Sequence, residues 1–199
     1  MRRGLLVVLS GPSGVGKTTV ARELLRDATF ARAVTATTRS PRPGEVDGRD
    51  YRFLEPGAFA VAVGRGEFLE HAEVHGRSYG TPREEVERIL DSGRTCLLVI
   101  DVQGAATLRG AGFPALSVFL APPSEEALRE RLLGRGTEAG PERRLRFENA
   151  LRHEIPRRSE FDAVVVNDDV PRAAAEVRRL VEARLGGVGS AGDGPVTGN

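Results

Sequence analysis

Residues 11–18 combine the amino-acid types that hold a nucleoside triphosphate. They match the phosphate-binding pattern G-x-x-x-x-G-K-[ST] in full: Gly11, Pro12, Ser13, Gly14, Val15, Gly16, Lys17 and Thr18. The glycines let successive backbone N–H groups turn toward an anion, and the threonine hydroxyl is suited to Mg²⁺. Lys17 is the only lysine among 29 lysines and arginines. The chain therefore keeps a compact ammonium where terminal phosphates need one, which indicates that it binds ATP or GTP.

The residues around this loop predict the strand and the helix that must position it. Residues 5–9 form an unbroken apolar run, which is typical of a parallel strand buried on both faces. After the loop, Val20, Leu24 and Leu25 recur at helical spacing. A helix beginning near Gly16 would direct the positive end of its dipole at the phosphates.

Further apolar runs at residues 96–100, 116–120 and 163–166 predict strands of the same sheet. Helical patterns lie between them, at residues 82–90, from a serine cap at Ser124 through Leu133, and from Pro171 onward. Strands that alternate with helices after a phosphate loop predict an α/β fold. We expect a parallel sheet flanked by helices, with the nucleotide at the carboxyl edge of the strands.

Two segments interrupt this alternation within one domain at residues 1–185. Residues 34–81 contain short strands and turns with a helix near residues 58–63, and predict a small inserted α+β subdomain. Residues 134–147 begin glycine-rich and polar and predict a mobile lid. The core then comprises residues 1–33, 82–133 and 148–185. The glycine-rich tail at residues 186–199 is predicted to be disordered.

The composition limits the partners. The net charge of +1 gives no overall field for nucleic acid or a membrane, so we expect neither as a partner. Cys96 is the only cysteine and lies in an apolar run, which favours a core thiol. No apolar stretch approaches membrane-spanning length, and we expect a cytoplasmic protein. The sequence leaves a monomer and a homodimer open.

The inserted segment carries a second set of groups suited to a phosphate. Arg39 and Arg42 could clamp it, and the phenol of Tyr51 could donate to it. Taken alone, each arginine is better interpreted as an ordinary surface charge, so this interpretation depends on the surrounding pattern.

That pattern resembles guanylate kinase from Gly4 to about Leu185. The matching segments, in order, are residues 11–19 (GPSGVGKTT), 37–45 (TTRSPRPGE), 50–51 (DY), 67–70 (EFLE), 79–81 (YGT), 100–105 (IDVQGA), 121–124 (APPS), 134–138 (GRGTE) and 166–169 (VNDD). The resemblance implies the reaction ATP + GMP ⇌ ADP + GDP with Mg²⁺ required.

The resemblance also assigns the acceptor residues. Those that would hold the GMP phosphate are Arg39, Arg42, Tyr51 and Tyr79, and those that would contact the guanine are Glu70, Thr35 and Thr81. The chemistry of Glu70 fits, because guanine presents two donors, N1–H and N2–H₂, on one edge. Adenine would leave the carboxylate unpaired.

For ATP, the resemblance implies binding by residues 11–19, including Thr19, with Asn167 beside the adenine. The catalytic cations would be Lys17, Arg131, Arg135 and Arg146. Thr18 would hold Mg²⁺ directly, and Asp101 would hold it through water. Because the acceptor oxygen of GMP is already ionised, catalysis would rest on alignment and charge neutralisation.

One residue departs from the family pattern. Val99 stands two residues before Asp101, where the family usually has an acid that contacts the guanine amino group. The valine predicts weaker GMP binding, by about 1–2 kcal/mol, or relaxed base choice. Two alternatives stay open: a related kinase with a different phosphate acceptor, and a silent guanylate-kinase-like binding module. The presence of Lys17 and of the lid arginines argues against the module.

Overall fold

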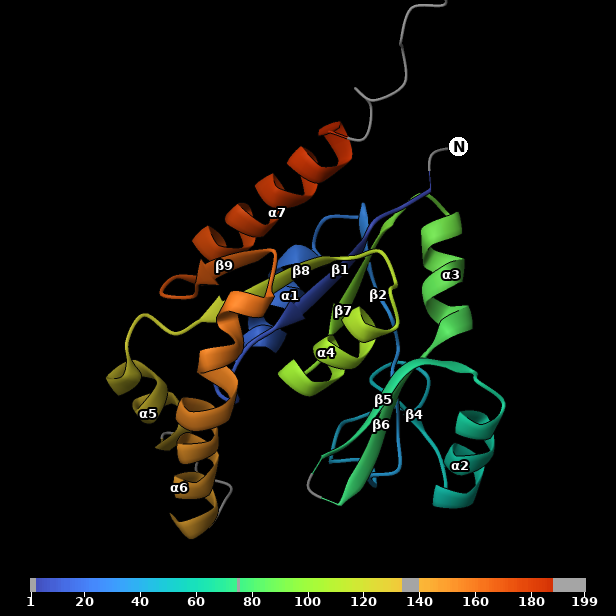
Figure 1. Cartoon of the computed structure of the whole chain (residues 1–199), viewed down its shortest axis with the longest axis horizontal. Coiled ribbons are helices and arrows are strands. Elements are labelled where there is room, and N and C mark those ends of the chain that lie inside the picture. Colours follow the sequence, from blue (N-terminus) through green and yellow to red (C-terminus); the bar gives the residue numbers. More distant parts are fainter. Residues whose placement is uncertain (1–2, 75, 134–139, 188–199) are drawn as a thin grey trace, which may run out of the picture.

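The computed structural model describes residues 3–74, 76–133 and 140–187. At its centre is a five-stranded sheet in the order β2-β7-β1-β8-β9, in which every pairing is parallel (Figure 1). The strands are β1 (Leu6–Ser10), β2 (Phe30–Arg32), β7 (Thr95–Val99), β8 (Leu116–Ala121) and β9 (Ala163–Val166). Parallel strands end at a common edge, and the phosphate loop, residues 11–18, follows β1 at that edge.

Alternate residues of the central strands face two separate cores. Val7 and Leu9 of β1 pack with α1 (Lys17–Leu24) and α7 (Val170–Gly187) on one face. Leu6 and Val8 pack with α3 (Arg83–Asp91) and α4 (Val102–Gly110) on the other. Cys96 is buried in the second core, as expected of a structural thiol. The expected α/β fold, a parallel sheet flanked by helices, is confirmed.

A second, four-stranded sheet forms the inserted subdomain. Its order is β4-β3-β6-β5, with β3 (Ala36–Thr37), β4 (Arg52–Phe53), β5 (Phe68–Val74) and β6 (Arg77–Pro82). Helix α2 (Pro56–Gly64) packs on it through Phe59, whose ring stacks on that of Phe68 with centroids 4.7 Å apart. The subdomain is joined to the central sheet through β2 and α3, and it projects to one side of it (Figure 1).

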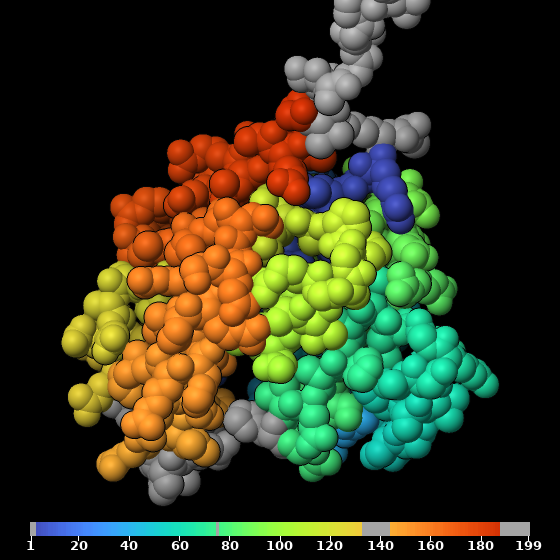
Figure 2. Space-filling model, in the orientation of Figure 1, coloured from blue at the N-terminus to red at the C-terminus, as the bar shows by residue number. Residues whose placement is uncertain are grey.

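On the opposite side of the molecule lies a helical segment, residues 125–133 and 140–160. It contains α5 (Glu125–Leu133), α6 (Gly140–Asn149), the π-helical turn η1 (Ala150–Glu154) and the 3₁₀ segment η2 (Ile155–Glu160). Ala150 and Ile155 pack against Leu128 and Leu132 of α5. Figure 2 shows residues 140–160 and the inserted subdomain on either side of α4.

The element boundaries differ in places from those that the sequence predicts. Strand β2 is an unpredicted edge strand, because its three residues are too short for a pattern. Helix α6 continues past residue 147, the expected end of the lid, into η1 without a break. Residues 134–139, which include Arg135, lie outside the described part of the chain.

The last helix also runs further than predicted. Helix α7 continues to Gly187, so residues 186–187 of the expected disordered tail are helical, and residues 188–199 lie outside the described part. The serine cap is confirmed, since the N–H of Ala127 donates to Oγ of Ser124 at 3.1 Å. No helix in the described ranges is long and apolar enough to cross a membrane.

Candidate functional site

The phosphate loop adopts a backbone that requires glycine. Gly11, Gly14 and Gly16 have φ angles of 137°, 81° and 100°, which other residues rarely adopt. A Cβ atom on Gly11 would lie 2.3 Å from the carbonyl oxygen of Leu120, and one on Gly16 would lie 2.6 Å from Nδ2 of Asn167. The loop is therefore fixed both by its own torsions and by close neighbours.

Lys17 is held within the loop. Its Nζ donates to the carbonyl oxygens of Gly11 at 2.6 Å and Pro12 at 3.1 Å. Helix α1 begins at Lys17, so the positive end of the helix dipole and the ammonium both lie at the loop. This is a cationic cradle of the kind that binds phosphates.

Two side chains from distant parts of the sequence support the loop from behind. The carbonyl oxygen of Val15 accepts from Nη1 of Arg131 at 3.1 Å and from Nδ2 of Asn167 at 2.7 Å. Nη2 of Arg131 also donates to the backbone oxygen of Asn167 at 2.9 Å. Both residues thus contact the loop through its Val15 carbonyl, while the predicted roles, Asn167 beside the adenine and Arg131 as a catalytic cation, stay predictions. Asn167 is buried, and its Oδ1 has no hydrogen-bond partner among the described residues.

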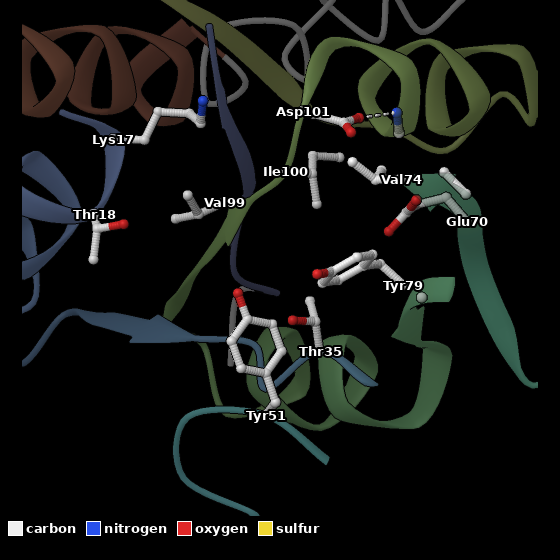
Figure 3. Close-up of a pocket in the computed structure, with 13 residues that line it drawn as sticks. Lys17, Thr18, Thr35, Tyr51, Glu70, Val74, Tyr79, Val99, Ile100 and Asp101 are labelled. Carbon is white, nitrogen blue, oxygen red and sulfur yellow. Dashed lines mark hydrogen bonds between the residues drawn. The ribbon is translucent and has the colours of Figure 1, made fainter. Parts of the chain in front are cut away.

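A central pocket of about 230 Å³ separates the phosphate loop from the inserted subdomain (Figure 3). It brings together seven residues that the sequence singled out, namely Lys17, Thr18, Thr35, Tyr51, Glu70, Tyr79 and Asp101. Its remaining walls are Ala72, Val74, Gly80, Val99, Ile100 and Gly104. Gly80, Ile100 and Gly104 lie in segments that match the family, whereas the sequence gave no signal for Ala72 and Val74, because small apolar residues on a strand resemble ordinary core.

Glu70 is the most unusual titratable group of the central pocket. It lies on β5, is 5% exposed, and accepts a 2.5 Å hydrogen bond from Oγ1 of Thr81. Burial raises the pKa of Glu70 to about 7, and the charge of Asp101 adds to the rise while the Thr81 bond opposes it. Gly104 allows α4 to approach, since a Cβ atom there would lie 2.9 Å from Oε2 of Glu70.

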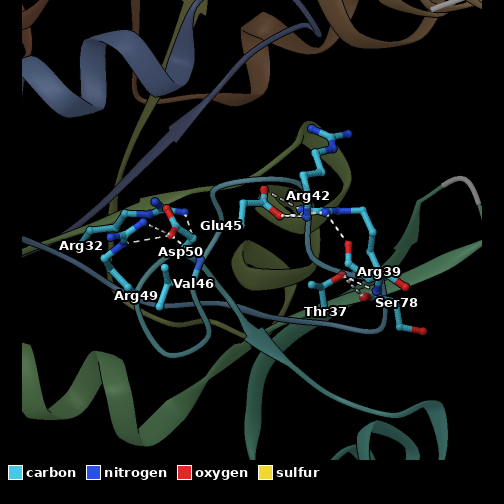
Figure 4. Close-up of polar contacts among 10 residues, drawn as sticks. Arg32, Thr37, Arg39, Arg42, Glu45, Val46, Arg49, Asp50 and Ser78 are labelled. Atoms are coloured by element: carbon cyan, nitrogen blue, oxygen red, sulfur yellow. Dashed lines mark hydrogen bonds and ion pairs between the residues drawn. The ribbon is translucent and has the colours of Figure 1, made fainter. Parts of the chain in front are cut away.

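Arg39 and Arg42, the two arginines expected at the GMP phosphate, do not line the central pocket. Figure 4 shows the polar contacts that they make instead. Arg39 makes a two-bond ion pair with Glu45, with both N···O distances 2.9 Å, and its guanidinium lies 5.3 Å from the ring centre of Tyr51. Glu45 also accepts from the backbone N–H of Arg42 at 2.7 Å. Arg39 therefore adjoins the pocket through Tyr51, while the exposed Arg42 belongs to the same turn.

The residues expected at a metal fit Mg²⁺ in number and kind. Asp101 and Thr18 border the same central pocket, and Oδ1 of Asp101 accepts from the N–H of Gly104 at 2.8 Å. The described residues contain no group of three or more His, Cys, Asp or Glu side chains that could hold an ion. Mg²⁺ bound with nucleotide typically uses one or two protein oxygens, water and phosphates, so this sparse set is suitable.

A family model for guanylate kinase matches residues 3–184. The chain belongs to the guanylate kinase family. Guanylate kinases of Rhodococcus jostii (strain RHA1) and Streptococcus thermophilus (strain CNRZ 1066) are 48% and 47% identical to it, over 190 and 183 residues. These matches span 92% and 91% of this chain, and 90% and 87% of the relatives.

The fold agrees with the family as well. The crystal structure of guanylate kinase from Anaplasma phagocytophilum superposes with a TM-score of 0.75 at 36% identity, covering 92% of this chain and 87% of that one. The resemblance predicted from the sequence motifs is therefore confirmed at the level of the guanylate kinase family. The match spans the phosphate loop, the inserted subdomain and the helical segment alike.

In this guanylate kinase family member, a second, larger hollow lies between the helical segment and the start of α4, with Ser13 of the phosphate loop and the end of β5 at its border. This outer pocket of about 550 Å³ is bordered by Ser13, Asp101, Arg146, Asn149, Glu154 and Arg157, among others. Arg146, one of the predicted cations, thus faces the same space as the loop. The sequence patterns did not single out Glu154 or Arg157, because one more charged residue on an arginine-rich helix carries no distinctive spacing.

Proposed function

We propose that the protein transfers the γ-phosphoryl group of ATP to GMP, and also to dGMP, giving ADP and GDP or dGDP with Mg²⁺ required. The observation that carries this proposal is the central pocket. It joins the cationic cradle of Lys17 and Thr18 to the buried carboxylate of Glu70 within one cavity. The site for ATP, the phosphoryl donor, would thus face the site that selects the base of the acceptor.

Glu70 would select guanine. Its two carboxylate oxygens match the N1–H and N2–H₂ donors of that base, whereas adenine offers an acceptor at N1. Thr81 orients the carboxylate through its 2.5 Å hydrogen bond, and Thr35 borders the same cavity. Burial makes a mismatch costly, since an unpaired carboxylate there would lack compensating bonds.

The monophosphate would lie at the other end of the pocket. Tyr51 and Tyr79 border it with rings 6.3 Å apart in an edge arrangement, and their hydroxyls are suited to phosphate oxygens. Arg39 adjoins Tyr51, and Arg42 lies in the same turn as Arg39. Both arginines could therefore supply positive charge to a phosphate there.

The transfer itself needs no general base. An ionised oxygen of the GMP phosphate forms a new P–O bond as the bond between the γ-phosphorus and the β–γ bridging oxygen of ATP breaks. Lys17, Arg131, Arg135 and Arg146 would neutralise the developing charge. Mg²⁺ would add charge neutralisation on the phosphates, with Thr18 and a water on Asp101 as its protein-side partners.

A coupled assay of ADP release tests this proposal. Mg·ATP is offered with GMP, dGMP, AMP, CMP or UMP as separate acceptors. We expect turnover only with GMP and dGMP, and none when Mg²⁺ is removed with a chelator. Turnover with AMP would contradict selection by Glu70, and silence with all five acceptors would contradict the proposed reaction.

Val99 supports a second candidate, a kinase that carries out the same transfer with relaxed base choice. Its methyl groups occupy a wall of the central pocket that a carboxylate would make polar. With no second hydrogen-bond acceptor at this wall, the pocket would favour the binding of guanine less strongly over that of hypoxanthine, which lacks the 2-amino group. Adding IMP to the acceptor panel tests this candidate directly.

A further inference from the structure

A carboxylate from the helical segment contacts the phosphate loop across 141 residues of sequence. The backbone N–H of Ser13 donates to Oε2 of Glu154 at 3.0 Å. Glu154 is half-buried and is the last residue of the π-helical turn η1. Such turns are rare, and they occur frequently at functional sites.

The Ser13 amide that makes this contact is separate from the amides at the N-terminus of α1. Within the loop, the N–H of Val15 donates to the carbonyl oxygen of Pro12 at 3.2 Å. The N–H groups of Gly14, Gly16 and Thr18 have no acceptor among the described residues. The protein itself thus supplies acceptors for the N–H groups of Ser13 and Val15. It leaves the N–H groups of Gly14, Gly16 and Thr18 for phosphate oxygens.

Glu154 also lies in a chain of contacts that leads to the arginines. Helix α6 carries Arg146 and continues directly into η1, and η2 then carries Arg157. All three side chains border the outer pocket together with Ser13. Turn η1 also packs against α5 through Ala150, so this segment contacts α5 through an apolar residue and the phosphate loop through Glu154.

We propose that Glu154 is a positioning residue for phosphoryl transfer: by accepting the Ser13 N–H, it docks the arginine-bearing segment 140–160 onto the phosphate loop. The carboxylate stays in place when ATP binds, because the phosphates use other amides of the loop. Its contribution is to hold Arg146 and Arg157 at a fixed distance from the transferred group. This inference rests on the proposed function, since it needs a phosphoryl group to be transferred at the loop.

Three variants test the docking bond. Glu154→Ala removes the acceptor, and Glu154→Gln keeps an oxygen that can accept the Ser13 N–H while losing the charge. Glu148→Ala is the matched control, because Glu148 is an exposed acid on α6 of the same segment. Each is compared with the wild-type protein in the ADP-release assay with GMP, after its thermal midpoint has been measured.

We expect Glu154→Ala to lower kcat by about 10- to 100-fold, the scale of one hydrogen bond to a charged group. The KM for GMP should hardly change, because Glu154 does not border the central pocket. Glu154→Gln should recover much of the lost rate, and Glu148→Ala should match the wild type. A kcat for Glu154→Ala close to wild type, or Glu154→Gln as slow as Glu154→Ala, would overturn the inference.

A measurement on the amide itself covers the case in which Glu154→Ala folds poorly. Hydrogen exchange of the Ser13 N–H, followed by NMR, should be slow in the wild type with and without a non-hydrolysable ATP analogue. It should be faster in Glu154→Gln. Loss of protection when the analogue binds, or a lower KM for ATP in Glu154→Gln, would mean that the carboxylate competes with phosphate, and would overturn the inference. An inactive wild type would instead count against the proposed function.

Discussion

In the proposed function, the phosphate loop and the central pocket would bind parts of two nucleotides by different means. The loop is eight consecutive residues whose backbone N–H groups form the site, with glycines at φ angles of 137°, 81° and 100°. The selective part of the pocket is made of side chains, on β5, β6, β7 and the segments around β3 and β4. A backbone site recognises any phosphate, whereas a side-chain site distinguishes one base from another.

This difference determines how each region can change. Gly11, Gly14 and Gly16 have neighbours within 3 Å of the missing Cβ, and their positive φ angles would strain any other residue, so substitution there disturbs the loop. Glu70 and Val99 can each be exchanged while the strands that carry them stay paired. Substrate selection should therefore be adjustable by single substitutions, and phosphate binding should not.

The largest effect is expected from a substitution that changes the phosphate loop and leaves the central pocket's guanine groups intact. Lys17→Met removes the ammonium from the loop, and kcat should fall by about 1,000-fold or more. GMP affinity, measured by calorimetry without ATP, should stay nearly unchanged because the guanine groups are intact. Retention of most of the rate would show that the loop does not serve the transfer.

Glu70→Gln tests the opposite region. The amide NH₂ would oppose the N2–H₂ of guanine, donor against donor, so kcat/KM for GMP should fall by about 100- to 1,000-fold. The KM for ATP should hardly change. Glu67→Gln, an exposed neighbour before β5, is the control. An equal loss of ATP affinity would mean that Glu70 supports the whole site and not base choice alone.

The phosphate loop and the central pocket could be predicted from the sequence to different degrees, because one is made of consecutive residues and the other is not. The loop was predictable with its strand and helix, because its function resides in consecutive residues. Glu70, Thr35 and Tyr79 became candidates through the family resemblance, since nothing in their local spacing brings β3, β5 and β6 together. Glu154 was missed, because its bond to Ser13 depends on a π-helical turn that no periodicity predicts.

Val99→Asp sharpens the comparison within the side-chain site. A carboxylate there should accept from the guanine amino group and lower the KM for GMP by about 5- to 30-fold. The assay belongs at pH 8 or above, because a second acid would raise the pKa of Glu70 further. Val99→Asn, with the same shape and no charge, is the control. An unchanged KM and unchanged selectivity would mean that this wall does not contact the base.

The smallest effect concerns pH. Guanine needs the ionised form of Glu70, whose pKa of about 7 exceeds the usual range. GMP affinity should therefore be full above pH 8 and fall about tenfold per unit below pH 7. The phosphate of GMP also titrates, near pH 6. Calorimetry with Glu70→Gln retains that titration, so only the difference between the two profiles reports on Glu70. Identical profiles would contradict the raised pKa.

The arrangement of Lys17 has a practical consequence for handling the protein. Its ε-amino group is the only one in the chain and is hydrogen-bonded to two loop carbonyls. Reagents that acylate amines can thus modify only the loop and the chain terminus. Amine coupling to a sensor surface would therefore attach the molecule through its chain terminus or through Lys17, and attachment through Lys17 would block the phosphate loop. The same chemistry, followed by mass spectrometry, would report occupancy of the loop, because ATP bound as proposed would shield the one internal amine.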